Sequence, residues 1–236
     1  MEYSKDLLFN ESISIKQKNK GYRFSVDPII LAGIIYVPED AKVADFGTGC
    51  GIIPIVLCKR FHKINVVGVE IQKDLAHIAT QNIKDNGFRD RVKIENIDIN
   101  EISQRGVYDF IVSNPPYIRQ GSGRLNPVEE VLIARHEIKI TITNFLSVAS
   151  KALKNKGRIA IIFPANRLSE LINEFKNSNI APKNLTIIYS KPGKNAELVL
   201  LEGVKNGGDE LKIYRPFYIN NEKGEYSDAM QRIFDI

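Results

Sequence analysis

The sequence has 236 residues, of which 43% are hydrophobic, so it is long enough for one α/β domain with a full core. Its formal net charge of +5 favours a polyanionic partner without identifying one. Cys50, Cys58 and the three histidines show no metal or redox spacing, so we expect neither a metal site nor a disulfide. The longest apolar stretch, residues 28–37, is too short to span a bilayer, and residues 1–6 lack a signal-peptide pattern. We therefore expect a cytoplasmic protein with no membrane contact.

The first forty residues predict a hairpin followed by a helix. Apolar residues alternate over 12–16, residues 18–21 can turn the chain, and residues 22–24 extend again. Asp27 precedes a proline, which is the favoured order at a helix start, and an apolar helix is expected over 29–36.

After residue 41, short apolar runs alternate with helical runs. Strands are expected over residues 42–46, 65–69, 92–97, 108–112, 159–163, 186–189 and 197–201. Helices are expected over residues 52–59, 74–86, 142–154 and 165–177. This alternation predicts a mostly parallel seven-stranded sheet with helices on both faces, in which the last two strands form an antiparallel edge pair. We expect a single domain, with the hairpin and helix in 1–40, the core in 41–203 and a short tail in 204–236.

A glycine-rich turn, residues 47–51, separates the first of these strands from its helix. A phosphate-binding loop would need Lys-Ser or Lys-Thr after the last glycine, where Ile52 and another isoleucine stand. A dinucleotide fingerprint would need glycine at the position of Ile52. An adenosyl ligand without a pyrophosphate fits better, and the methionine tail of S-adenosylmethionine can lie over the glycines.

Acidic residues end the second and third core strands. Glu70 follows Gly47 at the distance at which a carboxylate can accept hydrogen bonds from ribose hydroxyls, and Asp98 is placed to face an adenine. Taken singly, Glu70 could be a solvated strand end and Asp98 a turn cap. Ligands of open α/β sheets bind outside the carboxyl ends of the strands, so the joint pattern favours a cofactor site.

The fourth core strand ends at Asn114-Pro115-Pro116-Tyr117. These residues could be ordinary turn formers. However, the Asn114 side chain and the Pro115 carbonyl are two acceptors beside the aromatic face of Tyr117, which suits a planar amino group such as that of adenine, cytosine or glutamine. Asn114, Pro115 and Tyr117 are the predicted catalytic residues, whereas Cys50 has no base nearby in sequence and is not expected to be catalytic.

Basic residues lie in the loops on the side where ligands enter. They are Arg119, Arg124, Arg135, Lys191 and Lys194, and we expect them to bind RNA, the alternative being a solvated basic face.

Several of these motifs resemble known enzymes. Residues 45–51 and 114–117 together resemble class I S-adenosylmethionine-dependent methyltransferases that modify planar amino groups. Segments 21–27, 121–125, 134–137 and 191–194 more narrowly resemble the bacterial tRNA1(Val) adenine-37 N6-methyltransferase family. Phe46, where leucine is more usual, and Cys50, in place of serine or alanine, depart from the pattern without altering a polar contact.

The resemblance covers nearly the whole chain and implies a Rossmann-like methyltransferase that methylates N6 of adenine in tRNA, at adenosine 37 of tRNA1(Val). It implies S-adenosyl-L-methionine as the cofactor, tRNA as the partner and no metal, and it leaves the oligomeric state open. The cofactor-binding residues that it implies are Phe24, Asp27, Asp45, Gly47, Thr48, Gly49, Gly51, Glu70, Ile71, Asp98 and Asn114. Two rival functions stay open. One is a protein-glutamine methyltransferase, and the other is a catalytically idle nucleic-acid-binding module on the same scaffold.

Overall fold

The structure, a computed structural model, describes residues 3–18, 25–115 and 141–235. Its strands are β1 (Tyr3–Leu8), β2 (Ile13–Lys18), β3 (Lys42–Phe46), β4 (Asn65–Val69), β5 (Val92–Glu95), β6 (Tyr108–Ser113), β7 (Leu153–Pro164), β8 (Ile180–Tyr189), β9 (Ala196–Lys205), β10 (Lys212–Ile213) and β11 (Phe217–Tyr218). Its α-helices are α1 (Asp27–Ile34), α2 (Ile52–Arg60), α3 (Lys73–Asp85), α5 (Ile142–Ala152), α6 (Leu168–Asn177) and α7 (Asp228–Phe234), with short 3-10 turns η1 (Ile99–Glu101) and η2 (Ala165–Arg167).

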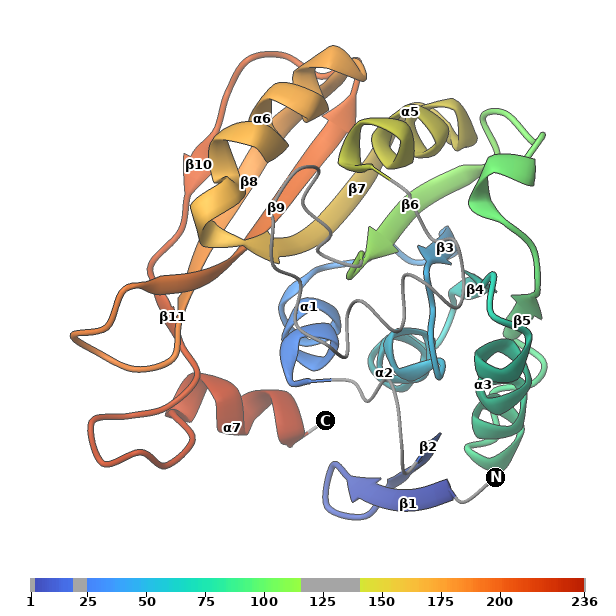
Figure 1. Ribbon diagram of the computed structural model, residues 1–236, viewed down its shortest axis with the longest axis vertical. Helices are drawn as coiled ribbons and strands as arrows, with labels where there is room; N and C mark the ends of the chain where they lie inside the picture. Colours follow the sequence, from blue (N-terminus) through green and yellow to red (C-terminus); the bar gives the residue numbers. More distant parts are fainter. Residues whose placement is uncertain (1–2, 19–24, 116–140, 236) are drawn as a thin grey trace, which may run out of the picture.

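The described strands form one large sheet and a separate hairpin. Seven strands in the order β8-β9-β7-β6-β3-β4-β5 make the body of the sheet, and the two-residue strands β10 and β11 both pair with β8 (Figure 1). All neighbouring strands are parallel except β9, which runs antiparallel to both β7 and β8. The predicted α/β class, with a mostly parallel sheet and an antiparallel pair, is confirmed.

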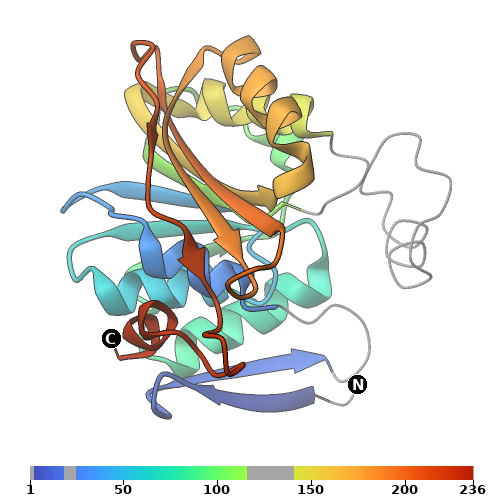
Figure 2. The ribbon, with the colours of Figure 1, turned by 90° about the vertical axis from the view of Figure 1, so that its left-hand side faces the viewer.

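Helices cover both faces of the sheet, because alternate residues of the central strands point to opposite sides. Phe110 and Val112 of β6 belong to one core with α1, α2 and α3. Ile111, between them, belongs to a second core with α5 and α6. The two layers of helices lie on either side of the sheet in Figures 1 and 2. No helix in the described ranges is long and apolar enough to cross a membrane.

The start of the chain contains a hairpin, which the structure forms from β1 and β2. β2 overlaps the predicted strand over residues 13–16, and it pairs antiparallel with β1, from Tyr3 opposite Lys18 to Leu8 opposite Ile13. The turn between them has three successive residues with positive φ, namely 54° at Phe9, 52° at Asn10 and 65° at Glu11. Of these three residue types only asparagine adopts a left-handed conformation readily, so the sequence gives little indication of a turn here. The expected second strand, residues 22–24, lies outside the described residues.

The last thirty residues, which the sequence left without predicted elements, contain β10, β11 and α7. Helix α7 lies against α1 so closely that a Cβ atom added at Gly33 would be 2.5 Å from Cγ2 of Ile233. Gly33 therefore lets the two helices approach each other, and this end of the chain is part of the packed structure.

Candidate active site

Several of the predicted site residues meet at one edge of the sheet, where the parallel strands end. Asp45 of β3 is in register with Gly68 of β4 on one side and Val112 of β6 on the other. The glycine loop, residues 47–51, Glu70 and Asn114 therefore follow three neighbouring strands at the same edge. A crevice outside the carboxyl ends of parallel strands is where open α/β sheets bind ligands.

The glycine loop is held over the end of β4 by its own backbone. Gly47, Gly49 and Gly51 have φ angles of 81°, 57° and 85°, a left-handed conformation that favours glycine. The amides of Gly47 and Thr48 both donate to the Val69 carbonyl, at 2.9 and 3.0 Å. The chain then enters α2 without a side-chain cap at Gly51. A Cβ atom added at Gly47 would meet no atom within 4 Å, so the loop leaves space beside this residue.

Glu70 is buried and bonded to the glycine loop. Its Oε2 atom accepts from the Gly49 amide at 2.9 Å and its Oε1 atom accepts from the Gln72 amide at 2.9 Å. Burial raises the pKa of this carboxyl, and the backbone amides of Gln72, Gly49 and Ile71 partly offset the rise. Each carboxylate oxygen has a further lone pair, so Glu70 can position the loop and still accept a ligand hydroxyl.

Asp45 and Thr48 are polar groups that the described residues leave without partners. Asp45 is 0% exposed, and neither of its carboxylate oxygens has a hydrogen-bond partner there; the Thr48 hydroxyl is likewise buried without one. Burial raises the pKa of Asp45 from 3.8 to about 7; the Glu70 carboxylate adds to the rise, and the nearby Thr48 hydroxyl opposes it. Buried polar atoms are normally paired, so an unpartnered carboxylate at a strand end indicates a ligand with donor groups.

Asp98 caps the short 3-10 turn η1, which is the alternative to its predicted contact with the adenine. Its Oδ1 atom accepts from the Asn100 amide at 2.8 Å and from Nδ2 of the same residue at 3.0 Å, at the start of η1.

Ile71, beside Glu70, is 40% exposed at this edge. Asn96 was missed in the sequence: its Nδ2 atom donates to the carbonyls of Glu70 and Ile71, at 2.8 and 3.0 Å.

Asn114 follows a strand end that is fixed by a buried hydrogen bond. The Ser113 hydroxyl donates to the Phe46 carbonyl at 2.7 Å, joining the ends of β6 and β3. Asn114 is half-buried and Pro115 is buried. Other predicted site residues lie outside the described residues, namely Phe24, Tyr117, Arg119, Arg124 and Arg135.

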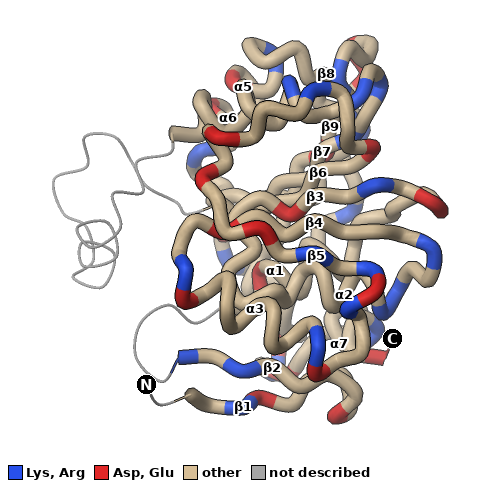
Figure 3. Tube along the Cα trace, turned by 90° about the vertical axis from the view of Figure 1, so that its right-hand side faces the viewer, with Lys and Arg blue, Asp and Glu red and all other residues tan. Residues whose placement is uncertain are grey.

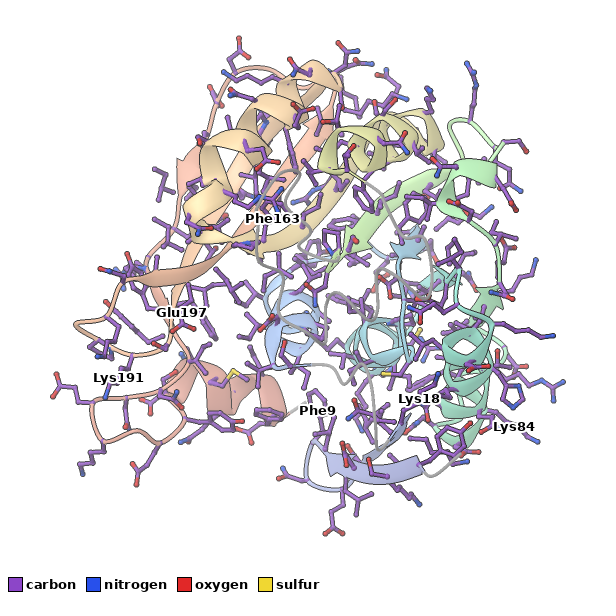
Figure 4. All side chains as sticks on the ribbon, in the orientation of Figure 1. Phe9, Lys18, Lys84, Phe163, Lys191 and Glu197 are labelled. Carbon is purple, nitrogen blue, oxygen red and sulfur yellow. The ribbon has the colours of Figure 1, made fainter. Side chains whose placement is uncertain are left out.

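The remaining predicted residues flank this edge or are buried. Asp27 begins α1, and burial raises its pKa, with the neighbouring Glu197 carboxylate adding to the rise. Lys191 and Lys194 lie in the turn between β8 and β9, at the carboxyl end of β8 and so at the same sheet edge; Figure 4 labels Lys191 and Glu197 there. Burial raises the pKa of Cys50 to about 12, which agrees with its exclusion as a nucleophile.

Comparison with known proteins places the chain in a family. Residues 29–185 match the family described as methyltransferase small domain. Two curated relatives named tRNA1(Val) (adenine(37)-N6)-methyltransferase, from two strains of Porphyromonas gingivalis, are 30% and 32% identical over 84% of this chain and 80% of theirs. A relative of the same name from Pedobacter heparinus is 28% identical over 93% of this chain and 92% of its own.

Solved structures show the same fold at low identity. A protein from Agrobacterium tumefaciens titled a predicted O-methyltransferase has a TM-score of 0.73 at 18% identity, over 89% of this chain and 95% of its own. The geranyl diphosphate C-methyltransferase of Streptomyces coelicolor, solved with S-adenosyl-L-homocysteine, has a TM-score of 0.56 at 12% identity, over 75% of this chain and 78% of its own. From the matched residues and the curated relatives, the chain belongs to the methyltransferase small domain family and, within it, to the bacterial tRNA1(Val) (adenine(37)-N6)-methyltransferases.

Proposed function

We propose that this protein transfers a methyl group from S-adenosyl-L-methionine to N6 of adenine in tRNA, at adenosine 37 of tRNA1(Val), in the cytoplasm. The observation that carries the proposal is the meeting of Asp45, Glu70 and Asn114 at one sheet edge, in a chain whose relatives bear that name. These residues offer acceptors for the donors of the cofactor and of the base.

The residues at this edge fit S-adenosylmethionine, which supplies an electrophilic methyl group on a sulfonium. The cofactor carries an ammonium, ribose hydroxyls and an adenine. The unpartnered Asp45 carboxylate suits the ammonium, because a buried acid at the glycine loop is best paired with a cation. Glu70 keeps lone pairs for the ribose, and the space beside Gly47 accommodates the methionine tail.

The amino group of the target base is activated by acceptors. We propose that the adenosine leaves its stack, that the Asn114 side-chain oxygen and the Pro115 carbonyl accept its amino protons, and that Tyr117 lies against the ring. Accepting both protons draws the nitrogen towards a pyramidal, nucleophilic geometry. No strong base is required, because the amino group becomes acidic once methylated and loses a proton late. Positioning and charge complementarity then supply most of the rate.

The affinity for S-adenosylhomocysteine should depend on pH through Asp45. Because the folded pKa of about 7 is above 3.8, the unliganded protein loses stability through this group as pH rises from about 4 through 7. Pairing with an ammonium needs the ionised form, so binding weakens as pH falls below 7. Calorimetry should show about tenfold weaker binding at pH 6 than at pH 8, and Asp45→Asn should flatten this dependence. If the parent protein binds S-adenosylhomocysteine equally well at pH 6 and pH 8, Asp45 does not bind the ammonium.

Binding of tRNA should depend on salt through Lys191 and Lys194. In Figure 3, Lys and Arg are interspersed with Asp and Glu along the chain trace; the two lysines matter because they lie at the sheet edge that carries the site. If each contacts a phosphate, each substitution by alanine should flatten the log-log salt slope by roughly 0.7 to 0.9. Lys63, an exposed lysine paired with Glu39 at the opposite edge of the sheet, is the matched control and should leave the slope unchanged. If the three alanine variants flatten the salt dependence of tRNA binding equally, the slope reflects the net charge of the protein and not phosphate contacts of Lys191 and Lys194.

Competition between substrates tests the function itself. Unmodified tRNA and a glutamine-containing peptide are supplied together with labelled S-adenosylmethionine, and the initial rates of label transfer to each are compared. We expect transfer to tRNA alone, since binding energy from the folded RNA draws the base into the site. Faster transfer to the peptide would favour the glutamine methyltransferase, and cofactor and tRNA binding without transfer would favour the idle module.

A further inference from the structure

Helix α3 takes the place of a neighbouring strand on the open edge of the hairpin. Asn86 accepts the Ser14 amide at 2.9 Å and donates to the Ser14 carbonyl at 2.7 Å. Asn82 accepts the Lys16 amide at 2.8 Å and donates to the Lys16 carbonyl at 3.1 Å. The helix can pair with the strand because the two spacings are similar. Side chains four residues apart on a helix are separated by about 5–6 Å, and residues two apart on a strand by about 6.5 Å. The two asparagines thus pair with β2 as a strand would.

Only Asn82 extends this pairing to the glycine loop. Its Nδ2 atom also donates to the Cys50 carbonyl at 2.9 Å, so both amide protons are used, and its side chain is 0% exposed. The second bond of the Asn86 amide goes instead to the Asn82 carbonyl, at the C-terminal end of α3. Asn82 therefore joins β2, α3 and the loop at one buried amide.

The helix touches the glycine loop at a second point. A Cβ atom added at Gly51 would be 3.3 Å from Cβ of Ala79, one turn before Asn82 on α3. The Gly49 amide is held from the other side by Glu70. The loop is thus in contact with both Glu70, at the end of β4, and α3, and the Asn82 side chain bonds directly to Cys50.

The hairpin is fixed to the body of the protein at both ends. At its tip Phe9 is 2% exposed, with its ring 5.3 Å from that of Phe234 in α7; Figure 4 shows Phe9 between the hairpin and α7. At its other end Lys16 pairs with Asp85 at 2.7 Å and Lys18 with Asp74 at 3.1 Å, both on α3. These contacts make the hairpin an element with a defined docked position.

We propose that Asn82 is a positioning residue that couples docking of the β1–β2 hairpin to the conformation of the glycine loop. The proposal rests on the proposed function only in placing the cofactor on that loop. Coupling of binding free energies is reciprocal. A docked hairpin therefore favours cofactor binding, and the bound cofactor stabilises the docked hairpin by the same amount.

Two alanine variants separate this coupling from simple loss of hairpin contacts. Asn82→Ala and Asn86→Ala each remove one pairing with β2, but only the first leaves the buried Cys50 carbonyl without its donor. Calorimetry should show about tenfold weaker S-adenosylhomocysteine binding for Asn82→Ala and less than about threefold for Asn86→Ala. In turnover the KM for S-adenosylmethionine should rise in Asn82→Ala, while kcat and the KM for tRNA stay within about twofold. Equal effects of the two variants on affinity would reduce Asn82 to a packing residue and overturn the coupling.

Hydrogen exchange in the parent protein tests the same coupling without relying on a variant that must fold. S-adenosylhomocysteine should slow deuterium uptake in residues 13–18 of β2 as well as in the glycine loop, and residues 212–218 at the far edge of the sheet serve as the control. Protection confined to the loop would overturn the proposal while leaving the function intact. A parent protein that binds no S-adenosylhomocysteine would instead overturn the cofactor assignment itself.

Discussion

Replacing Asn114 with alanine should slow methyl transfer to tRNA by about 100- to 1000-fold while leaving the affinity for S-adenosylhomocysteine within about threefold. The size follows from removing one preorganised hydrogen-bonding group that acts on the developing charge at the reacting nitrogen. Binding of the cofactor is spared, because its ammonium and ribose are assigned to Asp45 and Glu70. Single-turnover rates and calorimetry measure the two quantities separately.

The neighbouring serine provides the control for this variant. Ser113→Ala removes the hydrogen bond to the Phe46 carbonyl that fixes the end of β6, but it leaves both proposed acceptors in place. It should therefore slow transfer by much less than Asn114→Ala. If Asn114→Ala retains most of the parent rate, the amino group is activated by some other group and the proposed role of Asn114 is wrong.

Replacing Glu70 with alanine should weaken S-adenosylhomocysteine binding by about 10- to 150-fold. A hydrogen bond to a charged acceptor contributes about 1.5–3 kcal/mol, and the variant also frees the Gly49 amide that the carboxylate holds. Glu70→Gln keeps the shape and one acceptor, so its loss should be intermediate. Calorimetry on all three proteins gives this order. If Glu70→Ala binds S-adenosylhomocysteine as tightly as the parent protein, the ribose is bound by other residues of the sheet edge.

The alternation of strands and helices made most of the fold predictable, and the elements that escaped prediction are those with weak local signals. β10 and β11 have two residues each, too few for any periodicity to show. β1 has Ser4 and Asp6 on its half-buried side, so it lacks the apolar alternation that revealed β2. Its pairing depends on the turn at residues 9–12, which only Asn10 suggests.

The positions of Glu70 and Asn114 were predictable, because each follows directly on a strand that the sequence indicates. The site was not predictable where a polar side chain serves a distant backbone. Asn82, Asn96 and Ser113 bond to carbonyls that lie 25 to 67 positions away in sequence, and nothing local marks them. Asp98 shows the converse case: its place after β5 indicated a ligand contact, yet one of its oxygens is used to cap η1.

Methylation of N6 of adenosine 37 can be tested directly on the tRNA. Unmodified tRNA1(Val) is incubated with the protein and S-adenosylmethionine, then digested to oligonucleotides and nucleosides for mass spectrometry. We expect one N6-methyladenosine, in the fragment containing position 37, and none when adenosine 37 is replaced by guanosine. Methylation of a different position or atom, or no methylation by a protein that binds both the cofactor and the tRNA, would contradict the proposed function.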